Sequence, residues 1–157
     1  MTLVRALSGL LRPRLTIELV PRPCWHANVR AIVTPDQWNA IRHAVFERAA
    51  YRCEICGWRA TARHPLHCHE TWSYQGWRGV QKLEGFLALC RFCHEAKHLG
   101  LARTNGREHA ALAYLARING WSAGTAARYA AKCFKEFERR SRRTWRQDVS
   151  RLNEWVR

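Results

Sequence analysis

Hydrophobic and polar residues follow regular patterns in the first third of the chain. Residues 15–20 read Leu-Thr-Ile-Glu-Leu-Val, an alternation that predicts a β-strand ended by prolines. Residues 23–33 show no such pattern and are expected to form an irregular connector. Thr34 suits the N-cap, and Pro35 the first turn, of a helix over about 35–50. Apolar side chains at helical spacing predict its core-facing stripe: Trp38, Ile41, Val45 and Ala49.

The middle of the chain has the pattern of two strands followed by a helix. Residues 66–69 alternate apolar and polar side chains in a short strand. A Gly-rich turn region over 75–79 leads to a second strand over 80–89, which Gly85 is expected to interrupt. A helix should follow over about 93–99, where a glycine ends it.

The last third of the chain has only helical patterns. Apolar residues recur at helical spacing over about 105–119, where an Asn-Gly pair ends the pattern. Ser122 can cap a further helix over about 123–140. The predicted fold class is therefore α+β, in three parts: an N-terminal strand and helix (1–50), a strand–strand–helix unit (51–100) and a helical basic extension (101–157).

The charge of the chain is strongly positive. Its 157 residues include 27 lysines and arginines against 12 aspartates and glutamates, a formal net charge of +15. A protein this basic repels itself unless it meets a polyanion, so nucleic acid is the expected partner, with DNA as the favoured form. Trp145 is expected to pack beneath nearby arginines rather than to stack on a base. Basic side chains at the end of the last helix are the predicted phosphate contacts: Lys132, Lys135, Arg139, Arg140, Arg142, Arg143 and Arg146.

Seven cysteines indicate a reducing compartment. Four have metal-binding spacing, while Cys24, Cys68 and Cys133 are single and widely separated, so no disulfide framework is predicted. Segment 1–11 is amphipathic, and Arg5 leaves its apolar run too short for a signal sequence. No stretch has the pattern of a membrane span, so a cytoplasmic protein is predicted.

Two Cys-x-x-Cys pairs predict a structural zinc site. Cys53 and Cys56 form the first pair, and Cys90 and Cys93 form the second after a gap of 33 residues. Two residues between the cysteines of a pair let one tight turn present both thiolates, and four thiolates suit tetrahedral Zn²⁺. The gap between the pairs is long enough for a hairpin. We therefore expect a closed zinc site that holds the fold together.

Imidazoles around these pairs predict a second metal site. His94 and His98 are four residues apart on the predicted helix, so both rings project from one face. His67 and His69 share one side of the predicted first strand. Because the chain has only two aspartates, composition disfavours a two-metal site of clustered carboxylates and leaves one cation held mainly by imidazole. Three tryptophans of this segment are expected to wall the site or contact an unpaired base: Trp58, Trp72 and Trp77.

The order of these residues resembles the Cys-containing branch of the HNH endonucleases. That family folds as a ββα-metal unit, often held by a four-Cys zinc, and cleaves DNA with one divalent ion. The resemblance covers residues 51–100 and implies an HNH-type ββα-metal core with four-Cys zinc knuckles. The matching motifs are Cys53-x-x-Cys56, Leu66-His67-Cys68-His69-Glu70 and Leu87-Ala88-Leu89-Cys90-x-x-Cys93-His94-x-x-Lys97-His98.

The resemblance assigns roles to individual residues. The family's metal ligand and general base at the first strand fall on His69 and Glu70, and its helix ligand falls on His94. If the strand pair is shifted by one residue, Cys68 becomes the ligand and His69 the base. The candidate ligands of the catalytic cation are thus His69, His94, His98 and His67.

The implied activity is hydrolysis of DNA phosphodiester bonds, by nicking or double-strand cleavage. His69 or Glu70 would deprotonate water, and one Mg²⁺, Mn²⁺, Ni²⁺ or Zn²⁺ ion would stabilise the phosphate. Two departures favour an alternative, a weakly active or inactive zinc module that binds nucleic acid or scaffolds a larger nucleoprotein complex. Glu70 replaces the family's usual His, and Gly85 stands where its middle Asn is expected. A transcription regulator is disfavoured because no helix-turn-helix pattern stands out.

Overall fold

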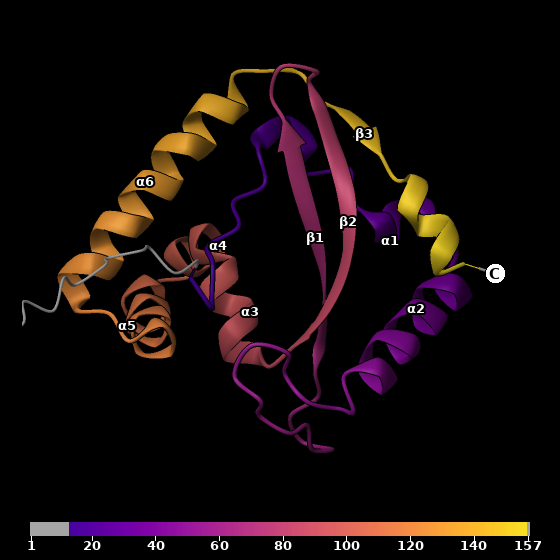
Figure 1. Cartoon of the computed structure of the whole chain (residues 1–157), viewed down its shortest axis with the longest axis horizontal. Coiled ribbons are helices and arrows are strands. Elements are labelled where there is room, and N and C mark those ends of the chain that lie inside the picture. The colour runs from indigo at the N-terminus through magenta and orange to yellow at the C-terminus, as the bar shows by residue number, and fades with distance from the viewer. Residues whose placement is uncertain (1–12, 157) are drawn as a thin grey trace, which may run out of the picture.

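The structure of the protein, a computed structural model, describes residues 13–156. It has the predicted α+β fold, in which helices flank a three-stranded sheet of order β1-β2-β3 (Figure 1). The elements are η1 (Arg22–Cys24), α1 (Val29–Ile32), α2 (Pro35–Arg48), β1 (His67–Gln75), β2 (Val80–Leu89), α3 (Arg91–Lys97), α4 (Leu99–Thr104), α5 (Glu108–Asn119), α6 (Ala123–Ser141), β3 (Arg146–Asp148) and η2 (Ser150–Glu154).

Helix α2 confirms the helix predicted over about 35–50. The Thr34 hydroxyl accepts a hydrogen bond from the Gln37 backbone N–H, and the Gln37 side chain accepts one from the Thr34 backbone N–H. This reciprocal cap satisfies two backbone donors that the helix itself leaves unpaired. Ile41 and Val45 are fully buried, so the predicted stripe packs α2 against the hairpin of β1 and β2.

Strands β1 and β2 form an antiparallel hairpin that runs from the pair His67–Leu89 to the pair Gln75–Val80. The second strand has the predicted bounds, and the Gly-rich segment forms the turn. The first strand continues well beyond the predicted 66–69. Its later residues are mostly polar but include threonine, tryptophan and tyrosine, which suit a half-buried strand paired with the apolar β2.

The predicted interruption near Gly85 is a β-bulge within a continuous strand. Thr71 pairs with Gly85 and Trp72 pairs with Leu83, so Glu84 is the extra residue. Gly85 has a φ of 146°, a conformation that side chains with a Cβ atom rarely adopt. Glycine therefore lets β2 bend here without losing its pairing with β1.

The prediction of a strand over 15–20 is wrong, because this segment is extended but pairs with no strand of the described residues. The Asn119 side chain replaces a neighbouring strand at Leu15: it accepts from the Leu15 N–H at 3.1 Å and donates to its carbonyl at 2.8 Å. Further along, the Glu18 N–H donates to the Lys97 carbonyl at 2.8 Å. The segment thus crosses the end of α3 and packs Leu15 into the core.

Other departures concern short elements. The connector over 23–33 contains η1 and α1, the latter capped by the Asn28 side chain. Helix α3 begins two residues earlier than predicted, and α4, which contains Gly100, was not predicted. Helices α5 and α6 are close to prediction, and Gly120 ends α5 in a left-handed conformation. Strand β3, which pairs in parallel with β2, was also not predicted.

Within residues 13–156, no helix has both the length and the apolar character needed to cross a membrane. The amphipathic segment noted over 1–11 lies outside the described residues.

Candidate metal centres

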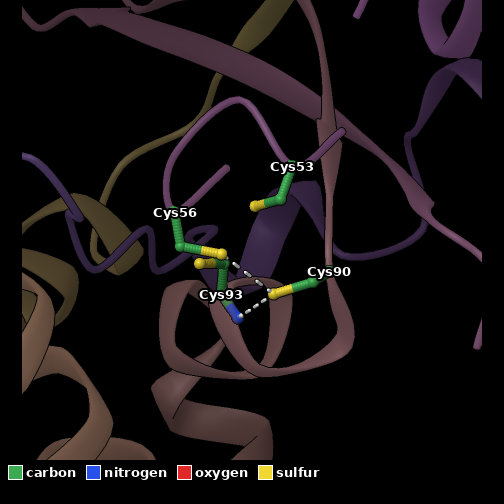
Figure 2. Close-up of side chains that lie close together, drawn as sticks. All are labelled: Cys53, Cys56, Cys90 and Cys93. Carbon is green, nitrogen blue, oxygen red and sulfur yellow. Dashed lines mark hydrogen bonds between the residues drawn. The ribbon is translucent and has the colours of Figure 1, made fainter. Parts of the chain in front are cut away.

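Four cysteines from two separate turns converge where β1 begins and β2 ends (Figure 2). We call Cys53, Cys56, Cys90 and Cys93 the four-Cys cluster; their sulfur atoms lie within 4.8 Å of one another. The sulfurs of Cys56 and Cys90 are 3.7 Å apart. Thiolates at a Zn–S distance of about 2.3 Å, at the corners of a tetrahedron, would be about 3.8 Å apart. The cluster therefore has the dimensions to hold a metal ion such as zinc.

The local backbone presents both cysteine pairs. In the first pair, the Gly57 N–H donates to the Cys53 carbonyl at 2.8 Å, and Gly57 adopts a positive φ of 77° that closes the turn. In the second pair, Cys90 caps α3, and its sulfur accepts from the Cys93 N–H at 3.5 Å. The positive end of the helix dipole lies beside these sulfurs and favours thiolates.

The clustered thiols influence one another's ionisation. Hydrogen bonds from Cys90 and Cys93 lower the pKa of Cys53. The same contacts with Cys53 raise the pKa of the Cys90 and Cys93 thiols. A divalent cation would let all four ionise together, because its charge offsets the repulsion between thiolates.

A second group of side chains, the His cluster, comprises His69 from β1 and His94 and His98 from the end of α3. One ring nitrogen from each lies within 4.8 Å of the other two. The ring centroids of His94 and His98 are 4.6 Å apart, and that of the buried His69 lies 5.4 and 4.9 Å from them. The structure thus brings together three of the four predicted ligands. The fourth, His67, stacks on His94 with 4.9 Å between ring centroids.

Burial keeps the imidazoles of His94 and His98 neutral at neutral pH. Burial, together with the charge of neighbouring histidines, lowers the pKa of His94 to about 3 and that of His98 to about 4. Burial and nearby arginines also lower the pKa of His67. A neutral imidazole has a free lone pair, so these side chains are ready to bind a cation at neutral pH.

Glu18 and Lys97 complete the surroundings of His69, and sequence reasoning assigned neither a role. The Glu18 carboxylate lies 2.7 Å from His69 Nε2 and 2.5 Å from Lys97 Nζ. Lys97, only 2% exposed, also donates to the Thr16 hydroxyl at 2.9 Å. Burial opposes ionisation of Glu18, but the hydrogen bond with His69 and the charge of Lys97 prevail and lower its pKa to about 2. The alternating pattern over 15–20 predicts that Glu18 lies on a polar side of the segment, but it does not indicate the contacts with His69 and Lys97.

The contact with Glu18 determines what His69 can do. When Nε2–H of His69 donates to this carboxylate, the lone pair of Nδ1 is left for a cation. A carboxylate behind a histidine is a common way to fix the ring of a metal ligand and to increase its basicity. Glu18 therefore suits the part of a residue that orients His69.

The structure does not bring Glu70 or Cys68 into the His cluster. The Glu70 carboxylate accepts hydrogen bonds from the Val29 N–H at 3.0 Å and from Trp72 Nε1–H at 3.1 Å. Burial raises the pKa of Glu70, although these bonds oppose the shift. Burial and the charge of Glu70 raise the pKa of Cys68 to about 12, so its thiol stays protonated at neutral pH and is a poor metal ligand.

The His cluster opens onto a cavity of about 980 Å³. All three imidazoles and Glu70 contribute to its wall. Basic side chains from three separate segments also line it: Arg22, Arg30, Lys132 and Arg140. An anionic substrate would therefore find both cations and imidazoles on the wall of one cavity.

The basic side chains predicted to contact phosphate differ in whether they form ion pairs with carboxylates. The Glu136 carboxylate pairs with Arg139 at 2.6 Å and with Arg140 at 2.7 Å. Trp145 packs, as predicted, but against Tyr74 rather than beneath arginines: the ring centroids are 5.2 Å apart, and Trp145 Nε1–H donates to the Arg140 carbonyl. Within residues 13–156 the remaining basic side chains of the set form no ion pair: Lys132, Lys135, Arg142, Arg143 and Arg146.

The three tryptophans predicted around the metal segment lie in different places. Trp72 lines the cavity, whereas Trp58 lies against His64 with 6.4 Å between ring centroids. Trp77 sits in the turn between β1 and β2, so it does not wall the site, whereas its contact with an unpaired base stays a prediction. The reason is the length of β1, which carries the turn far from the His cluster.

Comparisons of the chain with protein-family models, curated proteins and solved structures give no match. Function must therefore be inferred from the four-Cys cluster, the His cluster and the cavity beside it.

Proposed function

We propose that the protein is a metal-dependent, HNH-type endonuclease that hydrolyses phosphodiester bonds of DNA. One observation carries the proposal: three imidazoles converge on the wall of a cavity that basic side chains also line. They lie beside a four-Cys cluster and on a strand–strand–helix unit, which is the order of elements expected for an HNH core. A protein that needs zinc only to hold its fold has no use for this additional set of ligands.

The donor set of the His cluster fits one transition-metal ion. Three protein ligands are typical of catalytic zinc sites, which leave a position for water or substrate, whereas structural sites use four. Imidazole favours Zn²⁺ or Ni²⁺ over Mg²⁺, so we expect the softer ions among the four candidates. Such an ion, when bound, would lower the pKa of water and stabilise negative charge on the phosphate.

Residues of the chain supply the remaining functions. Glu18 holds the ring of His69, and Lys97 offsets the charge of Glu18. Glu70 lines the same cavity, and its raised pKa suits it to accept a proton from the attacking water. His69 is the alternative proton acceptor if His94 and the other histidines hold the cation without it.

Cleavage of supercoiled plasmid DNA tests the proposal. We expect nicking with added Zn²⁺ or Ni²⁺, and a loss of about 100-fold or more in His69→Ala and His94→Ala. His109→Ala is the matched control, because His109 is exposed on α5. Equal activity of all four proteins would refute this site.

A second candidate function is a nucleic-acid-binding zinc module without catalysis. Both carboxylate oxygens of Glu70 already accept hydrogen bonds, and Gly85 offers no side chain where the family's Asn is expected. Elemental analysis separates the two functions. One tightly bound zinc per chain supports the module, whereas a second, exchangeable metal that is lost in His94→Ala supports the endonuclease.

A further inference from the structure

The turn between β1 and β2 carries the most exposed large hydrophobic side chain of the described residues. Trp77 is 81% exposed, although tryptophan side chains are usually largely buried. The turn is held in place: Arg143 donates to the Gly76 carbonyl at 2.7 Å, and the Arg146 N–H donates to the Gly79 carbonyl at 2.8 Å. Trp77 is therefore presented by an anchored turn.

Figure 1 shows that the chain after the end of α6 runs to the turn between β1 and β2. Four arginines belong to this turn or to the segment over 142–146 that follows α6. The Arg78 guanidinium lies 4.2 Å from the centroid of the Trp77 ring. None of the four forms an ion pair with a carboxylate of residues 13–156. We call this group the tip surface; it comprises Trp77, Arg78, Arg142, Arg143 and Arg146, all of them exposed.

We propose that the tip surface binds an unpaired stretch of nucleic acid, with Trp77 stacked on a base and the arginines on the flanking phosphates. The inference rests on the proposed function and deepens it by naming where the substrate strand is held. An aromatic ring among cations is the usual platform for single strands, because every base has a π-face. Bases inside a duplex cover one another's faces, so an unpaired base fits Trp77 best.

The length of β1 sets the distance between this contact and the His cluster. From His69 to Gln75 the strand advances six residues, which at about 3.3 Å per residue is about 20 Å. If the bound strand keeps the stacked spacing of a duplex strand, about 3.4 Å per nucleotide, this distance corresponds to about six nucleotides. The stacked base should therefore lie about six nucleotides from the phosphate at the His cluster.

An anionic membrane is the rival occupant of a tryptophan among arginines. Peripheral membrane binding depends on the apolar area that enters the lipid, usually one face of an amphipathic helix. The tip surface offers a single indole on a β-turn, which gives little such area. Its arginines also continue the basic side of α6, where Lys132 and Lys135 are exposed.

Fluorescence anisotropy with labelled DNA, without a second metal so that no cleavage occurs, tests the proposal. We expect Trp77→Ala to weaken binding of a single-stranded 20-mer by about tenfold, and Trp77→Phe to retain most of it. Binding of a relaxed, covalently closed circular duplex should change less than about twofold, because its bases are all paired. Arg78→Ala should weaken binding more than its matched control Arg117→Ala, whose guanidinium similarly lies 4.7 Å from the Tyr114 ring on α5.

Equal binding of the single strand by wild type and Trp77→Ala would overturn the proposal, as would binding of anionic vesicles but not of DNA. His94→Ala separates this outcome from a failure of the proposed function. If Trp77→Ala weakens binding but His94→Ala cleaves like wild type, the tip surface stands and the proposed active site falls. If His94→Ala abolishes cleavage but Trp77→Ala binds the single strand like wild type, the proposed active site stands and the tip surface falls.

Discussion

Replacing Glu18 by glutamine tests the organisation of the His cluster most directly. Glu18→Gln keeps the size of the side chain but removes the negative charge between His69 and Lys97. The ammonium group of Lys97, whose side chain is 3% exposed, would then have neutral partners only. Removing one partner of a buried ion pair is costly because the remaining charge stays buried without compensation.

The size of the effect follows from the pKa of Glu18, which falls from 4.5 to about 2. A shift of this size corresponds to roughly 3 kcal/mol in favour of the ionised carboxylate in the folded state. Because the Glu18 side chain is 30% exposed, solvent screening reduces this value, and we expect Glu18→Gln to lower the free energy of unfolding by about 2 kcal/mol at pH 7. The stabilisation is present above pH 4.5 and is lost as the pH falls toward 2, so the two proteins should converge in acid.

Urea unfolding and metal titration measure the two consequences. The control is Glu138→Gln, because Glu138 and Arg22 form an ion pair of the same 2.5 Å length with side chains 50% and 49% exposed. An exposed pair contributes at most about 1 kcal/mol, so the control should lose much less stability. Affinity for the second metal should fall about 10- to 100-fold in Glu18→Gln alone, because His69 loses its orienting partner. Equal stability losses in both variants, or unchanged metal affinity in Glu18→Gln, would contradict the role assigned to Glu18.

Three further predictions concern the zinc site, acid stability and the backbone. Cys93→Ser should abolish tight zinc binding and leave the chain largely unfolded by circular dichroism, because a structural zinc contributes folding free energy directly; a native spectrum would contradict this. Because the pKa values of His94 and His98 are low in the folded state, the unfolded state binds more protons between about pH 6.5 and 4. The free energy of unfolding should therefore decrease as the pH is lowered through this window. A free energy of unfolding, measured with urea, that stays constant over this window would count against the prediction. Gly85→Ala should lower the free energy of unfolding by about 1–3 kcal/mol because of the φ of 146°. Gly124→Ala in the first turn of α6 should raise it by about 0.5–1 kcal/mol. Equal melting temperatures of the two variants would contradict this difference.

Features that depend on local spacing could be predicted from the sequence. The two Cys-x-x-Cys pairs and the helical spacing of His94 and His98 each involve neighbours along the chain, and the structure places both sets close together. The caps of α2 and α6 are equally local, since the Thr34 and Ser122 side chains bond backbone groups three residues away. Such interactions are decided within one turn of chain, where residue type is informative.

Features that depend on distant partners could not be predicted. Glu18 is 51 residues from His69 and 79 from Lys97, and nothing in the alternation over 15–20 indicates these contacts. The prediction of a strand over the same segment was wrong because the Asn119 side chain, rather than a neighbouring strand, forms hydrogen bonds with its backbone. Strand β3 consists of three polar residues that pair with β2 only because α6 ends beside the hairpin turn.

Helix α3 links the two clusters, and this link explains how a zinc site can control the histidines. Cys90 caps α3 and Cys93 lies in its first turn, so zinc at the four-Cys cluster would fix the start of the helix that carries His94. The first cysteine turn is joined to β2 by Glu54, whose backbone N–H donates to the Ala88 carbonyl at 2.9 Å and whose carboxylate accepts from the Ala88 N–H at 2.7 Å. Because β2 pairs with β1, the same ties set the position of His69 relative to α3. Zinc would therefore act on the His cluster through the hairpin and the helix together, while Glu18 orients the one ligand that comes from the sheet.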